Sequence, residues 1–232
     1  MKGVGVVAAL AAEARSLGFS TLRPDGMLLL GDGTLVLVSG MGVAAAEAAA
    51  RSLLEAGAQA LMSFGLAGGL DPALRAGSIV MPGEVIAPDG ARFVTSLDWR
   101  ESLAAALGTH CRVNTGRVLT SSRPVDTVAA KAAAFSSTGA VAVDMESAAV
   151  ARAAAERDVP FVAVRAIVDT ASDELPRAVV AASVAGKVRW LRLVRGLTRA
   201  PGELPALLRL MQRYRAALRA LTTVGDARRL AV

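Results

Sequence analysis

Carboxylate residues follow three apolar, strand-like runs of this sequence. Ligands of open α/β sheets bind beyond the carboxyl ends of the strands, so acids delivered there from several strands predict a site. A carboxyl group at the end of a buried strand has a raised pKa where it lacks a cationic partner, which suits a general acid near neutral pH. The acids are Glu13 after residues 4–10, Asp144 and Glu146 after residues 140–143, and Asp169 after residues 161–168.

Each of these acids also has a structural explanation. Glu13 and Glu146 could stand in the first turn of a helix, where the macrodipole favours negative charge, and we interpret Asp144 as an N-cap. Asp169 is harder to explain in this way, because it closes a buried strand and is followed by a loop-like segment. Arg165 on the same strand could be its cationic partner, and the sequence leaves this open.

Two glycine-rich segments accompany the acids. Residues 65–69 (GLAGG) follow the apolar run 60–64, and residues 39–42 (SGMG) follow another strand-like run. Glycines at such positions let backbone N–H groups approach a ligand. The spacing matches neither the dinucleotide-binding fingerprint nor the P-loop, and a tight turn between strand and helix explains each segment equally well.

The composition excludes several classes of protein. The chain of 232 residues is 53% hydrophobic but only 3% aromatic, which suits one α/β domain with a core of Ala, Val and Leu. A single cysteine excludes an internal disulfide, and a single histidine argues against a Ser-His triad, so we expect no metal site. Apolar runs are too short to span a bilayer. The first apolar run resembles a buried strand more than a signal peptide, and we expect a cytoplasmic location.

Strand-like runs alternate with helix-like segments from residue 4 to residue 169. Helix-like segments cover residues 43–56, 99–107 and 125–135. This alternation predicts a single-domain, three-layer α/β/α fold with a twisted, mixed but mainly parallel sheet. Prolines and glycines near residues 196–205 suggest a boundary between a domain of residues 1–198 and a tail of residues 199–232.

The charge is concentrated in the last part of the chain. Residues 1–186 carry 15 basic and 18 acidic residues, a net charge of −3, whereas residues 187–232 carry 11 basic and 2 acidic residues, a net charge of +9. Leucines and arginines fall on opposite faces of two helix-like stretches, residues 187–199 and 204–221. Such helices pack on the body or on a partner, or bind an anionic membrane surface. The scarcity of aromatic residues argues against nucleic acid.

Five motifs together resemble the nucleoside phosphorylase and nucleosidase superfamily, in particular its methylthioadenosine/S-adenosylhomocysteine nucleosidase branch. The resemblance covers about residues 3–195. Each motif is weak alone, but all five in this order and at these intervals are specific. The resemblance implies a twisted mixed sheet flanked by helices, and a homodimer. The motifs are GVV at 5–7 leading to Glu13, SGMG at 39–42, GLAGGL at 65–70, VDMESAA at 143–149 and VRAIVD at 164–169.

The resemblance implies a role for each acid. Glu13 matches the base that activates the attacking water, and Asp169 matches the acid that protonates adenine N7 as the base departs. Glu146 matches the carboxylate that binds the ribose hydroxyls, with Met145 packing on the sugar. Anionic neighbours suit this reaction because its transition state is a ribosyl cation. No cofactor is implied, only water or phosphate as co-substrate. The other implied substrate contacts are Leu66, Ala67, Gly68 and Val125.

The sequence departs from the family pattern at three places. Leu66 stands where a hydroxyl residue is common, and Val168 stands where a serine usually precedes the acid. Pro124 and Val125 align with the adenine platform, which is commonly an aromatic residue followed by an apolar one, so base stacking is weaker or is supplied elsewhere. Together with the basic tail, these departures make the chain most similar to the hopanoid-associated members that remove adenine from adenosylhopane.

We therefore predict an enzyme that cleaves the adenine N-glycosidic bond of a 5′-substituted adenosine, with adenosylhopane of hopanoid lipid biosynthesis as the expected substrate. Hydrolysis is favoured by Glu13, while phosphorolysis stays open because Arg15 and Arg123 could hold phosphate. One alternative is a methylthioadenosine/S-adenosylhomocysteine nucleosidase of methionine salvage. An alternative of another class is a non-catalytic protein that binds a nucleoside or an anionic lipid. The expected partners are the lipid nucleoside, a second subunit and, peripherally, the inner face of the membrane, without nucleic acid.

Overall fold

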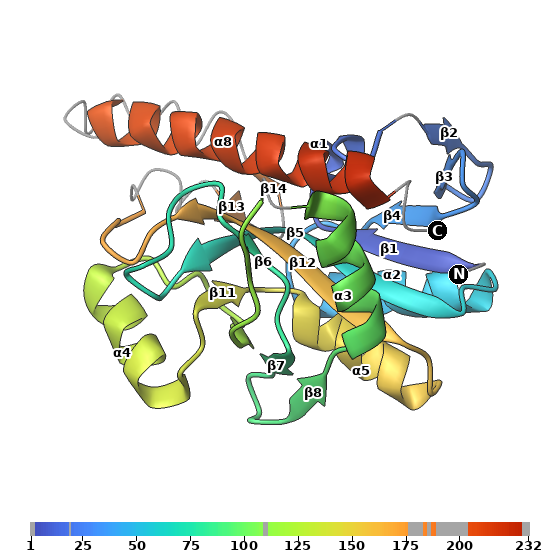
Figure 1. Ribbon diagram of the computed structural model, residues 1–232, viewed down its shortest axis with the longest axis horizontal. Coiled ribbons are helices and arrows are strands. Elements are labelled where there is room, and N and C mark those ends of the chain that lie inside the picture. Colours follow the sequence, from blue (N-terminus) through green and yellow to red (C-terminus); the bar gives the residue numbers. More distant parts are fainter. Residues whose placement is uncertain are drawn as a thin grey trace.

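The computed structural model describes residues 3–18, 20–108, 111–175, 183–184, 187–188 and 204–228. A mixed sheet of twelve strands runs through the middle of the molecule, with helices on both faces (Figure 1). Its strands are β1 (Val4–Ala8), β2 (Ser20–Leu22), β3 (Leu28–Leu30), β4 (Leu35–Val38), β5 (Ala60–Gly69), β6 (Ile79–Val80), β7 (Glu84–Ile86), β8 (Arg92–Val94), β9 (Val113–Asn114), β10 (Val118–Thr120), β11 (Ala142–Asp144) and β12 (Phe161–Asp169). The described helices are α1 (Ala11–Arg15), α2 (Val43–Glu55), α3 (Leu97–Leu107), α4 (Val128–Thr138), α5 (Ser147–Glu156) and α8 (Leu204–Arg228).

Parallel pairing dominates the centre of the sheet, as expected for strands that are apolar on both faces. β5 pairs in parallel with β1 on one side and with β12 on the other, and β1 also pairs in parallel with β4. β10 pairs in parallel with β7 and β11, whereas β11 meets the last residues of β5 in the antiparallel direction. The predicted fold class, a mixed and mainly parallel sheet between helices, is therefore confirmed.

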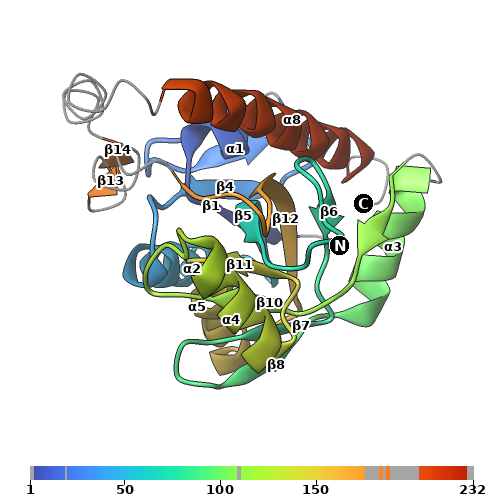
Figure 2. The ribbon, with the colours of Figure 1, turned by 90° about the vertical axis from the view of Figure 1, so that its left-hand side faces the viewer.

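Two groups of helices cover the two faces of the sheet (Figures 1 and 2). α2 and α5 pack together on one face, and small buried side chains of α2 at helical spacing allow this close approach. α1, α3 and α8 lie on the opposite face and share one apolar core with β1, β5 and β12. α4 stands apart from both groups, beside β11. Its ends are well defined, because Thr127 caps the first turn and Gly139 adopts the left-handed conformation after the last.

α8 packs along the body of the protein through its second half. Ala217, Leu221 and Val224 are buried in the core that α8 shares with β12 and α3. At Gly225 a side chain could not be accommodated, because an added Cβ would lie 2.2 Å from the carbonyl oxygen of Ser16. The predicted apolar stripe therefore buries its C-terminal part against the body. In the N-terminal half of α8, Leu208 and Met211 are exposed, at 52% and 45%.

The structure corrects several expected elements. Residues 65–69 are not a loop after a strand but the second half of β5, which runs without a break through its glycines. The helix expected over residues 125–135 begins only at Val128, because Thr127 is its N-cap and accepts the N–H of Ala130.

The helix-like stretch expected over residues 187–199 is also wrong at its start, because residues 187–188 form the strand β14 (Lys187–Val188), which pairs in the antiparallel direction with β13 (Ser183–Val184). Residues 189–199 of the first tail stripe, and the expected boundary between residues 198 and 199, lie outside the described residues. In the described part of the chain, no helix combines the length and the apolar character needed to cross a membrane.

Candidate active site

β5 is the strand against which the predicted acids gather. Its second half is rich in glycine because the side chains of neighbouring elements occupy the space where its own would stand. A Cβ at Gly65 would lie 2.7 Å from Oε1 of Glu13 and 3.1 Å from Nη1 of Arg165. A Cβ at Gly68 would lie 3.2 Å from Oδ2 of Asp169. The glycine segment thus serves close approach to charged side chains of this chain.

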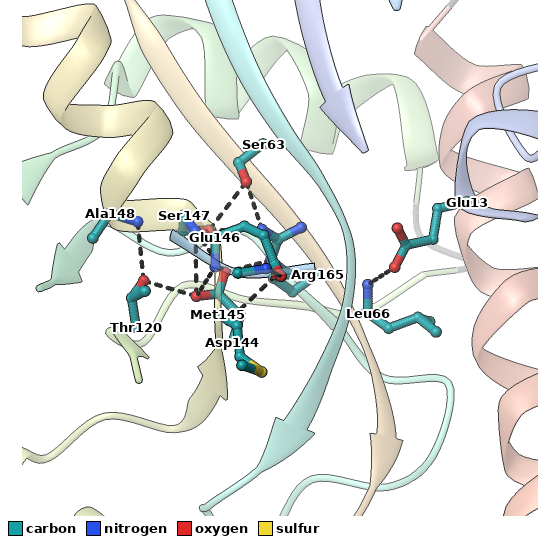
Figure 3. A network of polar contacts seen from close by, with 11 residues as sticks. Glu13, Ser63, Leu66, Thr120, Asp144, Met145, Glu146, Ser147, Ala148 and Arg165 are labelled. Carbon is teal, nitrogen blue, oxygen red and sulfur yellow. Dashed lines mark hydrogen bonds and ion pairs between the residues drawn. The ribbon is translucent and has the colours of Figure 1, made fainter. Parts of the chain in front are cut away.

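Glu13 is placed by the turn between β1 and α1. Its carboxylate accepts hydrogen bonds from two backbone N–H groups, that of Leu10 at 2.8 Å and that of Leu66 at 2.9 Å. The first contact fixes the start of α1, and the second ties Glu13 to β5 (Figure 3). Burial raises the pKa of Glu13, while the N–H of Leu66 and the charge of Arg165 oppose that rise. A buried carboxylate with a raised pKa can accept a proton from water near neutral pH.

Arg165 stands at the centre of a polar cluster (Figure 3). Its side chain is 2% exposed, and its Nε donates to Oδ2 of Asp144 at 2.6 Å. Its Nη2 donates to the hydroxyls of Ser63 and Ser147. Burial opposes the charge of the guanidinium, but Asp144 and Glu146 outweigh that effect and raise the pKa of Arg165. Arg165 is therefore the partner of Asp144, and the open possibility that it pairs with Asp169 is wrong.

The interpretation of Asp144 as an N-cap is wrong, because Glu146 is the N-cap of α5, but the side chain of Asp144 bonds to the start of that helix and takes part in this cluster. Its carboxylate accepts the N–H of Ser147, at 3.2 Å to Oδ2, and the hydroxyl of Thr120 at 2.7 Å. The hydroxyl of Thr120 in turn accepts the N–H of Ala148 at 2.9 Å. Two orphan donors at the first turn of α5 are thereby satisfied, and this fixes the direction in which the chain leaves β11.

Glu146 lies between the cluster and the second glycine segment. Its Oε1 accepts the N–H of Gly42 at 2.8 Å, and Gly42 has a φ of 102°, which favours glycine. Burial raises the pKa of Glu146 from its ordinary value of 4.5 to about 7, with a further rise from the charge of Asp144 and a partial offset by Arg165. Met145, beside it, is half-buried. The segment 39–42 therefore holds Glu146 in place.

Asp169 ends β12 opposite Gly68, after a register shift between Ile167 and Asp169. Such a bulge re-aims the side chain that follows it, and here Val168 is the residue involved. The carboxylate pairs with the ammonium group of Lys131, which comes from α4 and is fully buried. Burial raises the pKa of Asp169, and Lys131 counteracts this rise. Asp169 is thus a buried acid with a cationic partner from a helix that the sequence analysis did not connect with it.

The loop after Asp169 is fixed by a second acid. Asp173 accepts hydrogen bonds from the N–H of Thr170 at 2.9 Å and from its hydroxyl at 2.6 Å, and it pairs with Arg213 of α8. Although burial disfavours its charged form, the hydrogen bonds from Arg213 and Thr170 lower the pKa of Asp173 to about 2. α8 also comes close to Glu13 through Tyr214. Burial raises the pKa of Tyr214, and the negative charge of Glu13 raises it further.

The remaining predicted contacts have different surroundings. Leu66 is partly buried against the core beside α8, and only its backbone N–H reaches Glu13. Ala67 is buried in a small cluster with Ile167. Val125 is partly buried against residues of α4 and β11, so it is a small apolar surface where the family pattern has an aromatic residue.

Sequence reasoning missed Lys131, Asp173 and Arg213. Lys131 gave one signal, because it is a lone charged residue within the otherwise apolar stretch of an alanine-rich helix. Asp173 and Arg213 gave none, since their pairing joins a loop to a helix far along the chain. Among the described residues, no group of three or more His, Cys, Asp or Glu side chains is arranged to hold a metal ion.

The family follows from a comparison of the sequence with family models. A model described as the phosphorylase superfamily matches residues 26–187, well over half of the chain. The chain belongs to the phosphorylase superfamily. The matched range contains Glu146 and Asp169, while Glu13 precedes it. This membership confirms the prediction of a nucleosidase or phosphorylase type of enzyme, and the expected use of water or phosphate without a cofactor agrees with it.

Solved structures resemble this superfamily member over nearly its whole length. A putative 5′-methylthioadenosine/S-adenosylhomocysteine nucleosidase from Francisella philomiragia is 18% identical, with a TM-score of 0.73 and coverage of 100% of this chain and 98% of that chain. The corresponding nucleosidase from Neisseria meningitidis, in complex with methylthio-immucillin-A, is 20% identical, with a TM-score of 0.69 and coverage of 97% and 98%. Futalosine hydrolase of Helicobacter pylori is 17% identical, with a TM-score of 0.70 and coverage of 97% of each chain. A comparison with curated protein sequences found no match.

Proposed function

We propose that this member of the phosphorylase superfamily hydrolyses the N-glycosidic bond of a 5′-substituted adenosine and releases adenine. The observation that carries the proposal is the arrangement of three buried carboxylates, Glu13, Glu146 and Asp169, around the glycine-rich half of β5. Membership of the superfamily supports the reaction class, and the nucleosidases among the structural neighbours agree with it.

The proposed reaction assigns one step to each acid. Protonated Asp169 donates its proton to N7 of adenine, so that the bond between C1′ and N9 breaks and its electron pair stays with the base. The sugar becomes a ribosyl cation, which the negative charge of the site stabilises. Glu13 accepts a proton from water as the water oxygen bonds to C1′. Glu146, whose carboxylate is held by Gly42, binds the ribose hydroxyls, and Met145 packs on the sugar.

The charge balance of the site favours water over phosphate. Around β5 the four buried carboxylates of Glu13, Asp144, Glu146 and Asp169 face two buried cations, and each cation is already paired with an acid. Even with Asp169 protonated, as the proposed reaction requires, the carboxylates of Glu13, Asp144 and Glu146 outnumber the two cations, and this excess opposes the entry of a phosphate dianion. Arg15 and Arg123, which could have held phosphate, are both exposed. These observations support hydrolysis.

For the 5′ substituent we propose a large apolar group, with adenosylhopane as the substrate. α8 passes close to Glu13 (Figure 3) and binds the loop after Asp169 through Arg213. Five and two residues before Arg213, respectively, the apolar side chains of Leu208 and Met211 are exposed. An apolar 5′ group could lie on this surface. Val125 offers adenine a smaller apolar surface than an aromatic residue would, so base stacking contributes less to binding. Contacts of a large apolar 5′ group could supply the missing affinity, which supports the same substrate.

We further propose that the protein is a homodimer and that the basic tail, residues 199–232, touches the inner face of the membrane peripherally. Exposed arginines of α8, Arg209, Arg215 and Arg219, lie on the same helix as Leu208 and Met211. Basic and apolar side chains on one helix support contact with anionic lipid. Sedimentation with anionic and with neutral vesicles tests this contact, and equal binding to both would contradict it.

The function is tested by measuring adenine release with and without phosphate. We expect release without phosphate, faster from adenosylhopane in detergent than from methylthioadenosine. Strict dependence on phosphate would show phosphorolysis. Efficient turnover of methylthioadenosine alone would assign the protein to the soluble nucleosides instead. Binding of a nucleoside without any adenine release would indicate a non-catalytic protein.

A further inference from the structure

The polar contact that the proposed reaction does not explain is the one between Lys131 and Asp169. Lys131 is the fourth residue of α4, and its side chain is 0% exposed. Its Nζ donates to Oδ2 of Asp169, to the carbonyl oxygen of Thr170 at 2.8 Å and to that of Asp173 at 2.9 Å. Three acceptor oxygens thus match the three N–H groups of an ammonium ion.

Stability alone gives little reason for a charge at this position. A buried ion pair is weak evidence for a stabilising role, because desolvation of the two charges offsets their attraction and an apolar pair can replace them. The other buried ion pair, between Arg165 and Asp144, connects two strands of the sheet. Lys131 instead reaches from a helix at the edge of the fold to the residue proposed to protonate the base.

We infer that Lys131 is the positioning residue of Asp169: its ammonium group holds one carboxylate oxygen and the loop that follows, and so leaves the other oxygen to reach the purine. This inference rests on the proposed role of Asp169. Oδ2 is the atom held by Lys131, which leaves Oδ1 for the base. The contacts to the carbonyl groups of Thr170 and Asp173 fix the chain immediately after the acid.

The charges that face Asp169 show what else Lys131 does. Lys131 approaches from α4, and Asp173 approaches from the following loop with its own partner, Arg213 of α8. On the side of β5 the neighbour is Gly68, which brings no charge. Burial raises the pKa of Asp169, Lys131 lowers it, and Asp173 raises it slightly. Without Lys131 the acid would stay protonated to a higher pH, so Lys131 sets the pH range in which Asp169 can lose and regain its proton.

The test is the pH profile of kcat/KM for adenine release. Activity requires protonated Asp169, so kcat/KM falls as the pH rises through its pKa. In Lys131→Met this alkaline limb should move up by about 1–3 pH units, the effect of one opposite charge on a neighbouring carboxyl. The rate on the acid side should fall about 10–100-fold, because the acid is less well placed. Lys131→Gln, which is neutral but can still donate hydrogen bonds, should move the limb in the same direction and serves if Lys131→Met does not fold.

Two controls decide the interpretation. Lys131→Arg keeps the charge and should leave the limb where it is, while Arg51→Met removes an exposed cation from Glu47 and Glu156 and should change neither limb nor rate. If both neutral variants lose activity without any movement of the limb, Lys131 is only structural and the inference is overturned.

A stability measurement separates this inference from the proposed function. Asp169→Asn leaves the ammonium group of Lys131 buried without its counter-charge, so its Tm should fall. The double variant Lys131→Met/Asp169→Asn should regain part of that loss. If the Tm loss of the double variant equals the sum of the losses of the two single variants, the two side chains are not coupled. That result would overturn the inference, whichever reaction the protein catalyses. Full adenine release by Asp169→Asn would instead contradict the proposed function and leave the pairing intact.

Discussion

In the described part of the chain, two buried cations pair with acids of the candidate site, Arg165 with Asp144 and Lys131 with Asp169, and they do so in different ways. Arg165 belongs to the sheet, and its partners are Ser63 on the adjacent strand β5, Asp144 on β11 at the other side of β5, and Ser147 at the first residue of α5. Lys131 belongs to a helix, and its partners are Asp169 and the carbonyl groups of the loop after it. The first cluster is fixed by the pairing of strands, whereas the second depends on how α4 and α8 sit against the sheet.

The difference matches the tasks proposed for the two clusters. Near Arg165 the acids outnumber the cation, which keeps negative charge where a ribosyl cation would form. Near Lys131 one cation meets one acid, and burial and charge act on its pKa in opposite directions. Binding of the sugar needs a fixed negative field, whereas a general acid must change its protonation state during every turnover.

Of all the variants, the one that changes Asp169, the acid paired with Lys131, should have the largest effect, and this effect is on the rate of the reaction. Asp169→Asn should lower the rate of adenine release by about 10²–10⁴-fold, the usual contribution of a general acid. Asp89→Asn is the matched control, because Asp89 is exposed and pairs with Arg152 at 2.7 Å. The control should keep the wild-type rate. Equal rates for Asp169→Asn and wild type would remove the distinction between the two clusters.

Loss of the central cation should have the largest effect on stability. Arg165→Met leaves Asp144 and Glu146 buried without a counter-charge, so the free energy of unfolding should fall by about 3–5 kcal/mol. Denaturation in urea measures this change. Arg51→Met, at a half-exposed surface ion pair, should cost less than about 1 kcal/mol. A similar cost for both variants would mean that the sheet does not depend on its buried charge cluster.

Glu146 should make the stability of the protein depend on pH. Because the folded state raises its pKa from 4.5 to about 7, folding takes up a proton between these values, and the free energy of unfolding falls as the pH rises through this range. Glu146→Gln removes this contribution. The variant should equal wild type below pH 4.5 and be more stable above pH 7 by an amount on the order of 3 kcal/mol. Urea denaturation at pH 4.5, 6 and 8 measures the difference, and a constant difference would be the contrary result.

The smallest effect is expected at the link between the second cluster and α8. Arg213→Met removes the partner of Asp173, and both side chains are partly exposed, at 32% and 19%. The free energy of unfolding should fall by about 0.5–1 kcal/mol at neutral pH. Since the pKa of Asp173 is lowered to about 2, this contribution should vanish as the pH falls from about 4 toward 2. A loss that persists at pH 2 would not come from this ion pair.

The sequence was sufficient to predict those strands and helices whose residues follow a regular apolar pattern. Apolar runs marked β1, β5 and β12, and alanines at helical spacing marked α2. The positions of Glu13 and Asp169 followed from the rule that site residues stand at the carboxyl ends of such strands. These predictions succeeded because they depend on local periods and on one rule of topology.

What the sequence could not show depends on contacts between distant segments. The glycines of residues 65–69 were compatible with a ligand-binding loop or a tight turn, because nothing local indicated that the side chains of Glu13, Arg165 and Asp169 would fill the space beside a strand. Arg165 shares its strand with Asp169, but β12 bulges between Ile167 and Asp169 before the acid, and the arginine pairs with Asp144 from β11 instead. The partner of Asp169 lies 38 residues earlier, on a helix whose other residues gave no sign of the site.

The position of α8 in the chain has a consequence for synthesis on the ribosome. α8 follows every other described element, yet Ala217, Leu221 and Val224 close one face of the sheet, and Arg213 binds the loop of Asp169. While the earlier residues emerge, only α1 and α3 cover that face, and partly folded chains with exposed apolar surface aggregate. The nascent chain therefore depends on α8, the last of its described helices, both to cover this apolar face and to fix the loop after Asp169, and this part of the fold is complete only after α8 has left the exit tunnel.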